Sequence, residues 1–161
     1  MSRDHFTEER QRLERVLSIL EAIAGRLNAG GVLPLHLLED ACEFVRASEE
    51  EGYEASQSSD GQPPLSFCVE QHIAARIPIR GMQQALSGLK WGDASAGERF
   101  ARYAREYVGL RRAHLRRDDR LIRRTRAEKP AGSAADRTVE SPAAQRVYDR
   151  LLENATSLTL G

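Results

Sequence analysis

Several residue types that mark particular classes of protein are scarce in this chain. The two cysteines, Cys42 and Cys68, are too few for a disulfide scaffold or a four-thiolate metal site. Aromatic residues make up only 6% of the sequence, so the core must be mostly aliphatic. No run approaches the ~20 apolar residues that a membrane span requires, and the first residues lack the apolar stretch of a signal peptide. We therefore expect a cytoplasmic protein with no membrane partner.

Lysine is almost absent too, because 22 of the 24 basic side chains are arginine. The 24 acidic side chains cancel this charge overall, but the two signs are unevenly distributed. Residues 1–70 hold 6 basic and 14 acidic groups, a net charge of −8, whereas residues 71–161 hold 18 and 10, a net charge of +8. The neutral total therefore excludes little by itself, and the two halves of the chain have opposite character.

Helical periodicity runs through almost the whole chain, and strand patterns are nearly absent. Apolar residues recur every three or four positions, which predicts four long helices over about residues 3–27, 34–56, 65–89 and 98–126. Pro78 predicts a kink or a local break in the third of them. Four such helices with short or moderate connections favour an all-α, antiparallel up-down four-helix bundle.

The C-terminal part of the chain has a different pattern. Residues 131–136 have the composition of a linker, and Ser141 followed by Pro142 is typical of a helix start. We therefore expect a four-helix bundle over residues 1–127, followed by a linker and a short helix over residues 128–161. The sequence leaves open whether this short helix packs on the bundle.

A few polar residues interrupt the apolar stripes, and their positions favour one end of the bundle. In the second helix the pattern through Phe44 and Glu51 predicts a buried face that continues to Glu54. Up-down topology would bring five such residues to a similar depth. They are Arg10, Glu54, His72, His114 and Asp118.

This cluster has two interpretations. Histidine and carboxylate side chains on facing helices are typical ligands of metal sites in helical bundles. Alternatively, the Arg10 guanidinium could lie between Glu54 and Asp118 and balance the buried charges without a metal. The residues alone leave both interpretations open.

At these positions the chain resembles the hemerythrin-like (HHE cation-binding) family, over roughly residues 8–122. The resemblance depends on the order and spacing of several segments. They are residues 9–17, Glu43-Phe-Val-Arg46, Glu51-Gly-Tyr53, Glu70-Gln-His-Ile-Ala-Ala-Arg76, Tyr103-Ala-Arg-Glu-Tyr107 and His114-Leu-Arg-Arg-Asp-Asp119. The third-helix segment is similar to the Glu-His-x-x-x-Arg pattern of bacterial members. The family's fold is a four-helix bundle that usually holds a non-haem di-iron centre.

The resemblance implies a metal site with fewer ligands than the family's own. Where the family has its first-helix histidine, this chain has Arg10, whose fixed charge disfavours a second cation. The implied ligands of a single iron are Glu54, His72, His114 and Asp118, and they suit a mononuclear site. Arg10, Arg76 and Asp119 are expected to form the rest of the buried polar site.

Two classes of function follow from this resemblance. The first is a metal-linked bundle that binds or senses oxygen, nitric oxide or redox state through a mononuclear or degenerate iron site. The second is a metal-free interaction or regulatory module in which Arg10 replaces the metal charge. The first class includes a weak peroxide-handling enzyme. Ordinary enzymology is not indicated, because the chain lacks a phosphate loop, a cofactor fingerprint and a nucleophile paired with a base. The sequence does not indicate a protein partner.

The strongest charge run lies in residues 105–126, with nine arginines against three acids. Such a run could bind nucleic acid, but Tyr107 is the only aromatic residue within it and no nucleic-acid-binding motif is present. We therefore expect a solvated helix face, paired with the acidic second helix, and no nucleic-acid partner.

Overall fold

The computed structural model describes residues 2–57, 66–128 and 142–159, and these residues are helical apart from two short turns. Inside the helices the side chains of 2–7, 9, 52–57, 66–69, 118, 121–128, 157 and 159 are not described. The helices are α1 (Ser2–Asn28), α2 (Leu35–Gln57), α3 (Ser66–Lys90), α4 (Ala96–Glu128) and α5 (Pro142–Thr159). The expected all-α class is confirmed for the described residues. α3 runs through Pro78 as one helix.

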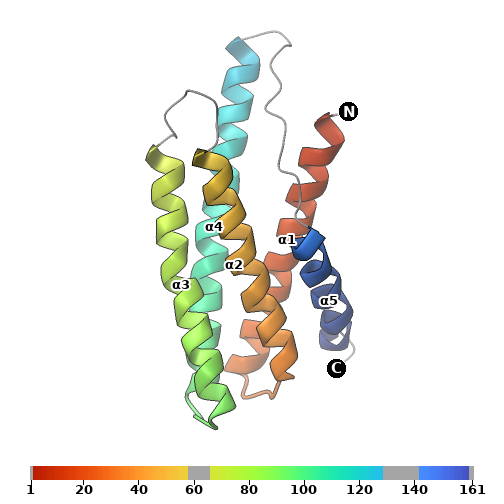
Figure 1. Ribbon diagram of the computed structural model, residues 1–161, viewed down its shortest axis with the longest axis vertical. Helices are drawn as coiled ribbons and strands as arrows, with labels where there is room; N and C mark the ends of the chain where they lie inside the picture. Colours follow the sequence, from red (N-terminus) through yellow and green to blue (C-terminus); the bar gives the residue numbers. More distant parts are fainter. Residues whose placement is uncertain (1, 58–65, 129–141, 160–161) are drawn as a thin grey trace.

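Successive helices run in opposite directions (Figure 1). α4 packs against α3 and α1, and α2 packs against α3. The C-terminal helix α5 packs against α2 and, less extensively, against α1. No helix in the described part of the chain combines the length and the apolar character that crossing a bilayer requires.

The apolar stripes of these helices meet in one core, as the helical periodicity predicts. The largest side chains in this core are fully buried and come from all five described helices. They include Leu17, Leu20, Ile23, Leu37, Leu38, Met82, Phe100 and Leu151. Since Tyr148, Leu151 and Ala155 belong to the same apolar cluster, α5 contributes to the core and is not a peripheral tail.

α3 and α4 approach each other closely at Gly81. The Tyr103 ring of α4 occupies the position that a Cβ at residue 81 would take. Glycine in the middle of a helix costs about 1 kcal/mol relative to alanine. Here that cost is offset by the close packing of an aromatic ring on the α3 backbone.

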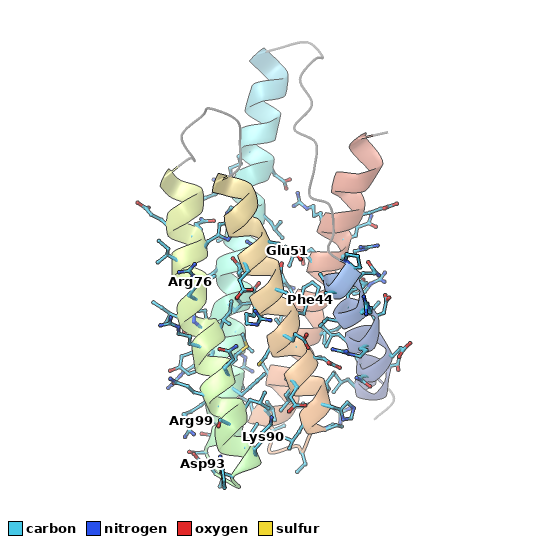
Figure 2. All side chains as sticks on the ribbon, in the orientation of Figure 1. Phe44, Glu51, Arg76, Lys90, Asp93 and Arg99 are labelled. Atoms are coloured by element: carbon cyan, nitrogen blue, oxygen red, sulfur yellow. The ribbon has the colours of Figure 1, made fainter. Side chains whose placement is uncertain are left out.

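The turn between α3 and α4 is held by its own hydrogen bonds. Gly92 has a φ of 79°, a conformation that favours glycine, and the Asp93 N–H donates to the Gly88 carbonyl at 3.0 Å, as in a Schellman motif. The Asp93 carboxylate accepts hydrogen bonds from the Ser95 backbone N–H at 2.9 Å and from Arg99 at 2.5 Å. Figure 2 shows Asp93 and Arg99 at this end of the helices. The connection thereby fixes where α4 begins.

The expected pairing of the basic fourth helix with the acidic second helix is found at one buried position, where Arg111 of α4 pairs with Glu49 of α2. Arg112 of α4 pairs with Glu14 and Glu21 of α1. Among the other acidic residues of α2, Asp40 and Glu43 contact Arg150 of α5, whereas Glu39 contacts Lys90 of α3. The acidic charges of α2 are therefore balanced by several helices and not by α4 alone.

Candidate functional site

The most deeply buried carboxylate described in the structure is that of Glu49, whose side chain is 5% exposed. Its position follows from the packing stripe of α2, in which Ala41, Cys42 and Val45 are buried one and two turns earlier. This stripe corrects the expected buried face of α2. Phe44 and Glu51 are only partly buried, and Phe44 faces α5, where its ring lies 6.0 Å from that of Tyr148 (Figure 2).

Three side chains from α3 and α4 surround the Glu49 carboxylate. His72 Nδ1 lies 2.6 Å from Glu49 Oε2, and Tyr107 Oη donates a hydrogen bond to Glu49 Oε1 at 3.0 Å. Arg111 Nε lies 3.2 Å from the same Oε1 and forms an ion pair. We call Glu49, His72, Tyr107 and Arg111 the Glu49 cluster. It joins α2, α3 and α4 in the interior.

Helical spacing explains why these side chains converge. His72 precedes the buried residues Ala75 and Ile79 on one stripe of α3. Tyr107 follows the buried Phe100 by two turns of α4, and Arg111 lies one further turn along the same side. The cluster thus occupies positions that would otherwise belong to the apolar core.

The electrostatics of the cluster favour an ionised Glu49. Burial alone would raise the pKa of its carboxyl, but the hydrogen bond from His72 and the charge of Arg111 together lower that pKa below its ordinary value. Burial and the neighbouring Glu49 charge raise the pKa of Tyr107 well above its ordinary value, so its hydroxyl keeps its proton and donates to Glu49.

His114 lies near this cluster, as its sequence position predicts. Its ring is tilted by 56° to that of His72, and the two ring centroids are 6.3 Å apart. His72 is buried and His114 is partly buried. The two histidines that the sequence singled out therefore do come together between α3 and α4.

Arg10 contacts Asp119, another residue of the expected polar site. Its guanidinium forms two parallel hydrogen bonds with the Asp119 carboxylate, one of them at 2.7 Å from Nη2 to Oδ2. Both side chains are partly exposed. The pair connects the first part of α1 with α4, and bidentate contacts of this kind give orientation as well as charge balance. The predicted bridge from Arg10 to Glu54 and Asp118 falls on side chains outside those the structure describes.

The remaining predicted residues have mixed outcomes. Arg76 is exposed on α3 and so is not part of a buried polar site (Figure 2). Helical periodicity did not single out Glu49, Tyr107 and Arg111 as site residues. Glu49 could have been found by continuing the stripe Ala41–Val45 by one turn, because a charged residue on a buried stripe indicates a polar cluster.

The described side chains do not assemble the ligand set that an iron centre needs. Within them, no three His, Cys, Asp or Glu side chains come together as metal ligands would. Glu49 is already engaged by His72, Tyr107 and Arg111. Glu54 and Asp118, the other two implied ligands, have side chains outside the described set.

Comparison with known proteins gives no family for this chain. No family model, no curated protein and no solved structure matches it. Function must therefore be argued from the cluster itself.

Proposed function

We propose that this chain is a metal-free helical module with an interaction or regulatory role. Its architecture is hemerythrin-like, with α1 to α4 as an antiparallel up-down four-helix bundle and α5 packed against it. Protein groups, and not a metal ion, balance the buried carboxylate at its centre. The observation that carries the proposal is the full set of partners around Glu49.

The charge of Arg111 is central to this interpretation. Burying a carboxylate without a cation costs several kcal/mol, whereas an ion pair with additional hydrogen bonds offsets most of that cost. Arg111 supplies the cation, and Tyr107 and His72 supply the hydrogen bonds. Arg111 thus balances a buried carboxylate, the role that the sequence predicts for Arg10, and Arg10 itself pairs with Asp119.

A cluster of this kind fixes the relative positions of the helices. Apolar side chains can slide into alternative packings, but a buried ion pair is satisfied in one arrangement only. Because the Glu49 cluster joins α2, α3 and α4, the surfaces of these helices have a defined geometry. A defined helical surface is what a module that binds a partner requires.

The first experiment measures metal content and the effect of a chelator. We expect protein purified from iron-supplemented medium to contain far less than one iron, manganese or zinc per chain. We also expect a strong chelator to leave the thermal unfolding midpoint unchanged. A stoichiometric metal whose removal lowers the midpoint would overturn the proposal.

A matched pair of variants tests the role of Arg111 directly. Arg111→Met removes the cation beside Glu49 and should lower the free energy of unfolding by about 3 kcal/mol, as expected when a buried charge loses its partner. Arg116→Met removes an exposed arginine from the same helix and should change it by less than about 0.5 kcal/mol. Equal effects of the two substitutions would contradict the proposed charge balance.

The approach of His72 to His114 favours a second candidate, a mononuclear non-haem iron site that binds or senses oxygen, nitric oxide or redox state. It would use Glu54, His72, His114 and Asp118 as ligands. Arg10→His adds an imidazole at the position where the family has one, so it should raise iron uptake in this case. In the metal-free case it should only destabilise the protein, since Asp119 loses its bidentate partner.

A further inference from the structure

One face of α3 points away from the core and has an unusual pattern. Ile73 and Ile77 lie one turn apart on it, with 50% and 65% of their surface exposed. Glu70 precedes Ile73 by three residues and Arg80 follows Ile77 by three, and both charged side chains are exposed. We call these four residues the α3 outer stripe. Large apolar side chains in adjacent exposed positions often mark an interaction surface.

The spacing of the α3 outer stripe is that of a helix-pairing seam. Positions 70, 73, 77 and 80 are separated by three, four and three residues, which keeps them on one side of a helix. Both the apolar pair and the charged pair are centred on position 75. A second copy of the helix placed antiparallel about this centre would set Ile73 opposite Ile77 of the copy, and Glu70 opposite Arg80 of the copy.

The charges therefore complement each other only in one orientation. In an antiparallel pair, each acidic end of the stripe meets a basic end, and this happens twice by symmetry. In a parallel pair, Glu70 would face Glu70 and Arg80 would face Arg80, which is repulsive. The order of charges along the α3 outer stripe thus favours antiparallel association with a second copy of the chain.

An additional apolar residue on α4 extends this surface. Leu110 is exposed and follows Tyr103 by seven residues, so it lies on the same side of α4. Since Tyr103 contacts α3 at Gly81, this side of α4 faces α3. Leu110 therefore adds apolar area beside the α3 outer stripe.

We propose that two copies of this chain associate through the α3 outer stripe, as an antiparallel pair with two-fold symmetry. The apolar contact is between Ile73 and Ile77, and the Glu70 and Arg80 charges at its ends set the orientation. The surface is small, so the dimer is weak and forms at high chain concentration. The association does not depend on whether the interior of the bundle binds a metal.

The test uses sedimentation equilibrium of the full chain from about 5 to about 500 μM, a range that covers weak association. We expect the mass to rise from 18.0 kDa toward twice that value as concentration increases. Glu70→Arg and Arg80→Glu should each weaken dimerisation about tenfold or more, because each places like charges opposite one another. An equimolar mixture of the two variants should restore it, since each acidic stripe then meets a basic one.

Two controls separate this arrangement from general association. Glu8→Arg makes the same charge change on exposed α1, and Trp91→Ala removes a side chain that is 88% exposed in the α3–α4 turn. Neither should alter dimerisation. The proposal is overturned if the chain stays at 18.0 kDa throughout, if the mixture associates no better than the single variants, or if either control has the larger effect.

Discussion

The two halves of the helix assembly are stabilised in different ways. The α3–α4 turn lies at the lower end in Figure 1. Near this turn, α3 and α4 are held together by aliphatic side chains, by the Gly81–Tyr103 contact and by backbone hydrogen bonds within the turn. Further along the same helices, charged and hydrogen-bonding side chains occupy the interior around Glu49. We call these the apolar half and the polar half. The same helices thus change the chemistry of their packing along their length.

This difference indicates that the apolar half supplies most of the stability and that the polar half fixes the relative positions of the helices. Apolar packing gains free energy from nearly any close fit, so it tolerates small rearrangements. The Glu49 cluster contributes less to the free energy of unfolding than the apolar packing does, because the cost of desolvating its charges opposes their attraction. Loss of one member of the cluster nevertheless destabilises the fold strongly. The polar half should therefore be the more sensitive to the loss of a single group.

The largest expected effect is the loss of the Glu49 carboxylate. Glu49→Ala leaves Arg111 beside a cavity and removes the acceptor of Tyr107. We expect the free energy of unfolding to fall by about 3 kcal/mol, the low end for a broken buried pair, because Arg111 retains some contact with solvent. Urea denaturation followed by circular dichroism measures this change.

The neighbouring residue provides a control for this prediction. Glu50 is exposed and pairs with Arg46 one turn earlier on the same helix. Glu50→Ala should therefore change the free energy of unfolding by less than about 0.5 kcal/mol. If both substitutions cost the same, the Glu49 cluster has no special role in the polar half.

The same contrast explains what the sequence could and could not predict. Helical periodicity gave the four long helices to within a few residues, and the stripe containing Leu17 and Leu20 is buried as expected. It also identified His72 and His114, since a histidine on an apolar stripe stands out. It failed on α2, where the pattern through Phe44 competed with the true stripe through Val45 to Glu49.

The remaining errors have a common physical cause. A helical pattern gives the face of a side chain but not the partner that a long side chain reaches. Arg10 extends to Asp119, and Arg112 extends to α1 and not to α2. Arg111 adjoins Arg112 in the sequence, yet it points inward to Glu49. Such choices depend on three-dimensional neighbours that periodicity does not specify.

The next largest expected effect is at Gly81 in the apolar half, where the Tyr103 ring contacts the α3 backbone. Gly81→Ala inserts a methyl group where the Tyr103 ring lies, so the ring or the helix must move. Overpacking of this kind typically costs about 1–3 kcal/mol, and the higher helix propensity of alanine returns about 1 kcal/mol of it. We expect a net loss of up to about 2 kcal/mol in the free energy of unfolding, measured in urea.

A second helical glycine serves as the matched control for this change. A Cβ at Gly25 of α1 would meet nothing within 4 Å. Gly25→Ala should therefore raise the free energy of unfolding by about 0.5–1 kcal/mol through helix propensity alone. Opposite signs for the two substitutions would confirm the close approach of α3 and α4, whereas two gains would contradict it.

The smallest effect concerns Asp93 in the α3–α4 turn and its dependence on pH. Hydrogen bonds from Arg99 and Ser95 lower the pKa of the Asp93 carboxyl to about 2, below the value of about 3.9 for an unfolded chain. Its stabilisation is therefore fully present above about pH 4 and is lost as pH falls through the folded pKa. We expect Asp93→Asn to have a slightly lower thermal unfolding midpoint than the wild type at pH 7, and the difference to disappear as pH approaches 2. A difference that stays constant down to pH 2 would show that the ionised carboxylate does not stabilise this turn. Because Asp93 is exposed, 0.5 M salt should also reduce the difference at pH 7, as screening predicts.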